Sequence, residues 1–141
     1  MKKTQKLIAA AGLIVIAGTA FGFYQYFRKP ADIRTLQADF TITASGIVAD
    51  YNNDENAANA KYLDKVICVK GNVSETKIST EGQCTVFLDS GDPLAAITCS
   101  FYEDEATAAK KLHPGEPVTI KGKCTGKLMD VVLNKCSLIK Q

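Results

Sequence analysis

The chain has two parts that differ in their pattern of apolar and polar positions and meet near Pro30. Residues 7–27 (LIAAAGLIVIAGTAFGFYQYF) form 21 consecutive uncharged positions, whereas from Leu63 onward apolar and polar residues alternate. A helix of 21 residues is ~31 Å long, which matches the hydrocarbon core of a bilayer. The pattern predicts a transmembrane helix from Leu7 to Phe27, preceded by a basic flank (residues 1–6) and followed by a tether (residues 28–42).

A cleaved signal peptide is the alternative interpretation of the same segment, because the basic start, the apolar run and the small residues 18–20 are all present. The run does not stop there, however. It continues through aromatic residues to Phe27 and then meets Arg28 and Lys29, the pattern of an interfacial belt with snorkelling cations. This favours a retained single-pass anchor in the lipid bilayer. The lysines of the basic flank favour an N-terminus inside and an exported C-terminal domain.

Residues 43–62 (TASGIVADYNNDENAANAKY) are predicted to be helical in two pieces. Thr43 can cap the first piece, and Asn53 or Asp54 can cap the second. Gly46 is an exception, because a helix former is expected at that position.

The remainder predicts mainly β structure. Five strands are expected at residues 66–74, 83–88, 94–101, 117–124 and 130–138, with one helix at 103–112. The order β-β-β-α-β-β at this length is that of an OB-fold, a five-stranded Greek-key barrel. We therefore expect residues 43–141 to form one domain, a helical lead-in plus the barrel, with an open α+β sandwich as the alternative arrangement.

Charge argues against a phosphate-binding surface. Five of the 17 basic residues, but none of the 15 acidic ones, precede Pro30, so the domain after it carries a net charge of −3. Nucleic-acid binding requires clustered Lys and Arg, and Lys121, Lys123 and Lys127 are the only short basic cluster. A solvated strand face explains these lysines more simply, and nucleic acid is therefore an unfavoured partner.

The five cysteines do not have the spacing of a zinc or thioredoxin-type site. If strands two and three form a hairpin centred on Gly91 and Asp92, Cys84 faces Cys99, and an inter-strand disulfide becomes a hypothesis that suits an exported domain. Small buried thiols in a tight barrel are the favoured alternative. The sequence therefore predicts neither a cofactor nor a metal site.

Aromatic and basic residues on the barrel are the candidates for a ligand face. Phe87, Phe101 and Tyr102 could stack on bases or sugars as in other OB domains, with Lys121 and Lys123 beside them. Filling the barrel is the more common role of such aromatics. The acidic run Glu103 to Glu105 fits a helix N-terminus better than a catalytic carboxylate pair, and no catalytic residues are expected.

Several segments together resemble the tRNA-anti-like OB-fold family: residues 38–44 (ADFTITA), 56–62 (NAANAKY), 70–73 (KGNV), 121–126 (KGKCTG) and 130–133 (DVVL). The resemblance covers residues 38–139. It implies a small protein of a kind that is often anchored at its N-terminus and has no assigned activity, and it carries over no functional residues. Our expectation is a membrane-anchored, non-enzymatic binding module of the cell envelope for an unidentified protein or glycan, with a single-stranded nucleic-acid or tRNA binder as the alternative.

Overall fold

The computed structural model describes residues 2–28 and 31–139. The chain separates into two compact units, Met1–Ala31 and Asp32–Gln141. The first contains α1 (Lys2–Phe27), whose large apolar side chains are exposed. This helix is long and apolar enough to cross a membrane, and a signal sequence near the N-terminus meets the same criteria.

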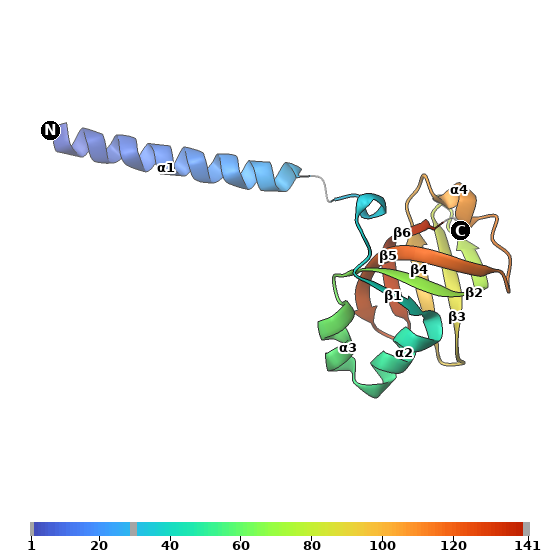
Figure 1. Ribbon diagram of the computed structural model, residues 1–141. Coiled ribbons are helices and arrows are strands. Elements are labelled where there is room, and N and C mark those ends of the chain that lie inside the picture. Colours follow the sequence, from blue (N-terminus) through green and yellow to red (C-terminus); the bar gives the residue numbers. More distant parts are fainter. Residues whose placement is uncertain (1, 29–30, 140–141) are drawn as a thin grey trace. The chain divides into compact units, whose positions relative to one another are not determined.

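The second unit contains all the strands (Figure 1). In chain order its elements are η1 (Ile33–Thr35), β1 (Phe40–Thr43), α2 (Ala44–Asn53), α3 (Glu55–Tyr62), β2 (Val66–Ile78), β3 (Cys84–Asp92), β4 (Ala95–Phe101), α4 (Ala106–Ala109), β5 (Pro117–Lys127) and β6 (Val131–Leu138).

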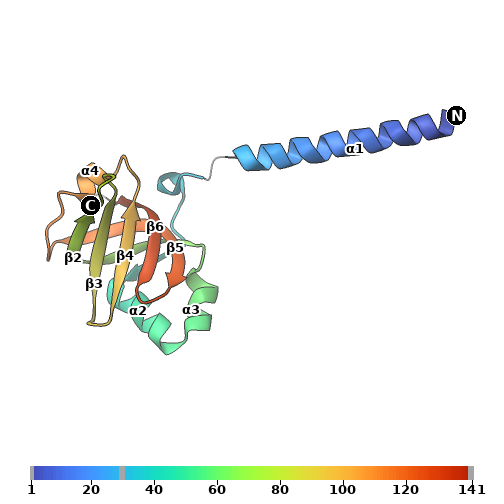
Figure 2. The ribbon, with the colours of Figure 1, turned by 180° about the vertical axis from the view of Figure 1, so that it is seen from behind.

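Strands β2 to β6 close into the barrel that the element order predicts. The strand order is β2-β3-β4-β6-β5, and antiparallel pairing of β2 with β5 closes it. The β4–β6 pair is parallel and the remaining barrel pairs are antiparallel. Figure 2 shows β3, β4 and β6 side by side from behind. This is the topology of an OB-fold, so the predicted fold class is confirmed and the open sandwich is excluded.

The segment predicted as a tether, residues 28–42, includes η1 and the start of a strand. Phe40–Thr43 forms β1, a sixth strand that pairs in parallel with β2, where Phe40 lies opposite Ile67. Asp39 fixes the start of this pairing, because its N–H donates to the carbonyl oxygen of Val66 and its carboxylate accepts from the Val66 N–H at 3.1 Å. A four-residue strand is too short for alternation to reveal it in the sequence.

The helical lead-in forms the two pieces predicted. The Gly46 N–H donates to Thr43 Oγ1 at 3.1 Å, and the Ala57 N–H donates to Asp54 Oδ1 at 3.0 Å, so Thr43 and Asp54 are the caps. Packing explains why position 46 is a glycine, because a β-carbon there would lie 2.9 Å from Thr43 Oγ1 and 3.1 Å from Ile42 Cγ1. The glycine leaves room for the cap.

The helix expected over residues 103–112 is much shorter. Only Ala106–Ala109 is α-helical, and Glu105 at its N-terminus makes no side-chain capping hydrogen bond. The acidic residues before it form turns, and Asp104 and Glu105 pair instead with Arg34.

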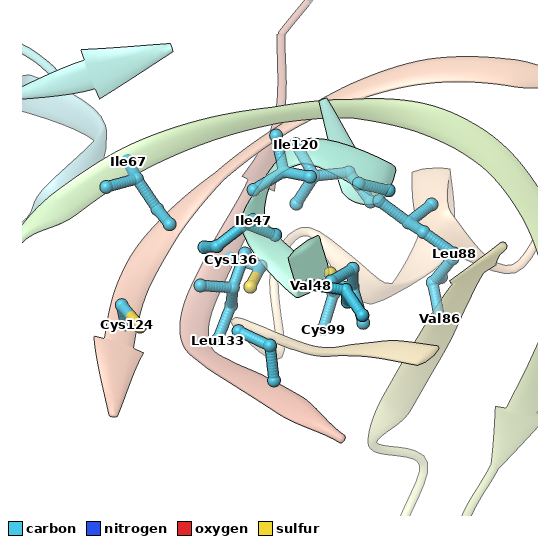
Figure 3. Packing of buried hydrophobic residues seen from close by; sticks show 14 of the residues in the cluster. Ile47, Val48, Ile67, Val86, Leu88, Cys99, Ile120, Cys124, Leu133 and Cys136 are labelled. Atoms are coloured by element: carbon cyan, nitrogen blue, oxygen red, sulfur yellow. The ribbon is translucent and has the colours of Figure 1, made fainter. Parts of the chain in front are cut away.

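The core lies inside the barrel, where α2 adds Ile47 and Val48 to the inward side chains of the strands (Figure 3). Close approach at Gly122 is part of this packing, since a β-carbon there would lie 2.6 Å from Cys136 Sγ. The outward side chains of the strands remain as the surface on which a ligand can bind.

Candidate binding surface

An OB barrel binds its ligands on the outer face of its second and third strands, which are β3 and β4 here, with β2 and β6 on either side. Alternation along β3 buries Cys84, Val86 and Leu88 and turns Thr85 and Phe87 outward. On this side of the sheet the strand register aligns outward side chains in two rows that run across the strands. We call these two rows the Phe87 face. Its members are Glu75, Phe87, Thr98 and Val132 in one row and Lys77, Thr85 and Ser100 in the next.

An aromatic ring surrounded by hydroxyl groups gives this face its chemistry. Phe87 is half-buried, and the Lys77 ammonium lies 4.9 Å from the centre of its ring. Lys77 also pairs with Glu75 at 3.5 Å. Because the basic and acidic charges offset each other, the Phe87 face favours an uncharged ligand with apolar and hydroxyl groups over a polyanion.

The other four residues predicted for a ligand face do not join Phe87. Phe101 ends β4 with its side chain inward and only 7% of its surface exposed, so it fills the barrel and cannot serve as a stacking platform. Lys123 lies on β5, where its ammonium pairs with Asp64 at 3.4 Å. The five residues predicted for a ligand face therefore do not lie together on one face of the barrel.

Tyr102 and Lys121 hold the segment before β1 against the barrel. Lys121 is 9% exposed, and its Nζ donates to the carbonyl oxygens of Arg34 at 3.0 Å and Leu36 at 2.8 Å. The Tyr102 hydroxyl accepts from the Ile33 N–H at 3.3 Å, and the Arg34 guanidinium lies 4.7 Å from the centre of the Tyr102 ring.

Arg34 completes this arrangement, which we call the Arg34 clamp (Asp32, Ile33, Arg34, Leu36, Tyr102, Asp104 and Lys121). Its guanidinium bonds the carboxylates of Asp32 and Asp104. The side-chain hydrogen bond from Arg34 lowers the pKa of Asp32 to about 2. Hydrogen bonds to the two carboxylates, that of Asp32 first, raise the pKa of Arg34. Sequence reasoning missed the clamp because the bonds from residues 32–36 to Tyr102, Asp104 and Lys121 join positions 69 to 87 apart, and no local pattern connects them.

The predicted Cys84–Cys99 disulfide is contradicted by the strand register. Cys99 lies opposite Val86, and all five cysteines are free thiols. Gly91, at φ +78°, belongs to an irregularity within β3, and the turn comes later at Pro93 and Leu94 because Asp92 pairs with Ala95. The thiols are buried except for the half-buried Cys68, as the favoured alternative predicted. Burial raises the pKa of the Cys68, Cys84 and Cys136 thiols.

Within residues 2–28 and 31–139 no cluster of three or more His, Cys, Asp or Glu side chains has an arrangement that could hold a metal ion. His113 is exposed, with Nδ1 3.8 Å from a Glu116 carboxylate oxygen.

Comparison with solved structures finds similar proteins at low sequence identity. A candidate nucleic acid-binding lipoprotein from Klebsiella pneumoniae is 17% identical with a TM-score of 0.58, covering 79% of this chain and 100% of its own. A candidate aspartyl-tRNA synthetase from Leishmania major is 10% identical with a TM-score of 0.48, covering 87% of this chain and 26% of its own. The Stn1–Ten1 complex of S. pombe is 18% identical with a TM-score of 0.43, covering 54% and 59%.

A search among curated proteins finds no match. The tRNA-anti-like family model matches residues 1–138, which include the N-terminal helix and the whole barrel. The strand topology agrees with this match, since the barrel is an OB-fold. The chain therefore belongs to the tRNA-anti-like family.

Proposed function

We propose that this chain is a membrane-anchored, non-catalytic OB-fold binding module of the cell envelope, and that its Phe87 face recognises an envelope glycan or protein. The observation that carries the proposal is the composition of that face. A half-buried aromatic ring is flanked by the hydroxyl groups of Thr85, Thr98 and Ser100 in register on two strands. Stacking on a ring combined with hydroxyl hydrogen bonds suits a sugar ring or a polar peptide.

The anchor in this proposal is the segment from Leu7 to Phe27 within α1, with the N-terminus inside and the domain exported. A topology reporter fused after Gln141, together with carbonate extraction of membranes, tests both points. We expect the reporter to be active only outside and the protein to stay with the membrane. A reporter active inside, or release into the soluble fraction, would contradict the anchor or its orientation.

A non-catalytic role is supported by the surroundings of the carboxylates and thiols that could act in catalysis. Asp104 and Glu105 lie beside Arg34 and help to fasten the Arg34 clamp. Burial raises the pKa of the Cys84 and Cys136 thiols, which makes these two groups weak nucleophiles near neutral pH.

The binding test uses the full chain in neutral detergent with fluorescent glycan fragments of the envelope as probes. Phe87→Leu keeps an apolar side chain but removes the ring, and we expect it to weaken binding about tenfold or more, as loss of base or sugar stacking does. Tyr102→Phe is the matched control, because Tyr102 lies in the Arg34 clamp and not on the Phe87 face. Equal loss in both variants would refute the site.

A single-stranded nucleic-acid or tRNA binder is the second candidate. It is supported by the OB topology and by the K. pneumoniae protein of the same fold, which is named for nucleic-acid binding. The net charge of −3 from Pro30 onward weighs against it. Binding of a labelled oligonucleotide that falls steeply with salt and depends on Phe87 would favour this candidate over the first.

A further inference from the structure

Three large apolar side chains are presented to solvent at one end of the barrel. Leu94, in the β3–β4 turn, is 84% exposed, and Leu128 and Met129, in the β5–β6 turn, are 91% and 80% exposed. We call these three residues the apolar tip. Single exposed apolar residues are ordinary, but a group of them on adjacent turns is typical of an interaction site.

The two turns lie next to each other because they precede paired strands. β4 and β6 run in parallel with Ile97 opposite Val131, so the residues before each strand emerge at the same end. The Asp130 carboxylate joins the turns, accepting from the Ala96 N–H at 3.0 Å and from Thr98 Oγ1 at 3.1 Å. Both views place these turns at the end of the barrel away from α4 (Figures 1 and 2).

The apolar tip is held by hydrogen bonds within its turns. The Leu94 N–H donates to Asp92 Oδ1 at 2.9 Å, and the Asp92 N–H donates to Ser90 Oγ at 3.1 Å. The buried Ser90 hydroxyl donates in turn to the carbonyl oxygen of Ala95. The Leu128 N–H donates to the carbonyl oxygen of Asp130 at 3.2 Å. A surface fixed before binding loses little conformational entropy when a partner docks.

Negative charge borders the apolar tip on one side. Asp89, Asp92 and Asp130 line, together with Leu94, a groove of about 340 Å³. None of these three carboxylates takes part in the ion pairs formed within the described part of the chain. Hydrogen bonds from the Leu94 N–H and from the Asn52 side chain, together with the charge of Lys127, lower the pKa of Asp92.

Charge decides which kind of partner fits. Anionic lipid head groups and nucleic-acid phosphates are repelled by the acidic groove. A Lys or Arg side chain can instead enter it, while apolar neighbours cover Leu94, Leu128 and Met129. We propose that the apolar tip docks a protein partner through a segment in which Lys or Arg is flanked by large apolar residues. This inference rests on the proposed role as a binding module and names a partner class for a second surface.

The test uses the full chain in neutral detergent and three labelled peptides, measured by fluorescence anisotropy. One peptide combines Lys and Leu, the second has Glu in place of Lys, and the third has Ser in place of Leu. We expect binding of the first alone, weakened by salt. The triple variant Leu94→Ser, Leu128→Ser, Met129→Ser should lose about tenfold or more in affinity, the loss expected when contact residues that carry the binding energy are truncated.

Ile78→Ser is the matched control, because Ile78 is also a large apolar residue, 56% exposed, and ends β2 away from the apolar tip. Equal binding of the Glu peptide, undiminished binding by the triple variant or no binding of the Lys–Leu peptide would overturn the inference. So would a nitroxide at position 128 found immersed in lipid in vesicles containing phosphatidylglycerol, or a photo-crosslinker there that captures a second copy. If the Lys–Leu peptide does not bind through the apolar tip while Phe87-dependent binding of glycan fragments persists, only this inference is refuted, whereas absence of Phe87-dependent binding refutes the proposed function.

Discussion

Gly122→Ala tests a close approach of β5 to β6. A β-carbon at position 122 would lie 2.6 Å from Cys136 Sγ, 3.2 Å from Leu133 Cβ and 3.3 Å from the carbonyl oxygen of Asn134. Cys136 and Leu133 are completely buried, and the third atom belongs to the backbone, so β5 must shift against β6 to relieve the clash. Overpacking of a core costs about 1–3 kcal/mol, and we expect about 2 kcal/mol less free energy of unfolding.

A second substitution separates this clash from other effects. Cys136→Ala removes the sulfur atom nearest the new β-carbon and leaves a small cavity, at a cost of about 1 kcal/mol. The double variant should therefore be more stable than the sum of the single effects predicts, by about 1 kcal/mol. Gly71→Ala is the milder comparison, because its β-carbon would meet Ala44 Cβ at 3.0 Å and other atoms only at 3.6 Å.

Urea unfolding of the full chain in neutral detergent provides the measurement. Near-UV circular dichroism reports on the buried ring of Tyr51 without a contribution from the α1 backbone. The reasoning is refuted if Gly122→Ala is as stable as the parent, or if the double variant loses the full sum of the two single losses. Either result would mean that β5 and Cys136 are not in close contact.

Three further predictions concern the Arg34 clamp and the thiols. Lys121→Met leaves the carbonyl oxygens of Arg34 and Leu36 without their donor. We expect the free energy of unfolding to fall by about 1–3 kcal/mol and the amides of residues 33–36 to exchange faster. Unchanged protection of these amides from exchange would exclude the clamp. The pKa of Asp32 is lowered from 3.8 to about 2. The ionised Asp32 carboxylate therefore contributes fully to stability above about pH 4, and this contribution is lost as the pH falls through 2. An NMR titration of this carboxyl group with a midpoint near 3.8 would contradict the prediction. Without reductant, a thiol reagent should label Cys68 first in the folded chain and all five cysteines after denaturation; fewer than five labels would indicate a disulfide.

The barrel and the helical lead-in could be predicted from the sequence because each depends on a pattern among residues that are close together in the chain. Alternation located all five barrel strands, and Thr43 and Asp54 marked the helix starts. The strands proved longer than predicted. β2, for example, reaches Ile78, where charged residues on an exposed edge conceal the alternation.

The candidate site was less predictable because it depends on register and on contacts between distant residues. The sequence did not separate Phe87, which is directed outward, from Phe101, although alternation along β4 should have placed Phe101 inside with Ile97 and Cys99. Lys121 seemed to be a free surface lysine, and only the fold reveals its bonds to carbonyl groups 85 and 87 positions away. The cysteine pairing failed because Gly91 was taken for the turn.

The Arg34 clamp begins at Asp32, immediately after the first unit ends at Ala31. Proteolytic processing after the small residues near position 20 would leave each of its bonds intact, because all its members follow that point. The bonds that hold the segment before β1 against the barrel are therefore the same whether the apolar helix is kept as an anchor or removed as a signal sequence, and both interpretations of that helix are compatible with one domain structure.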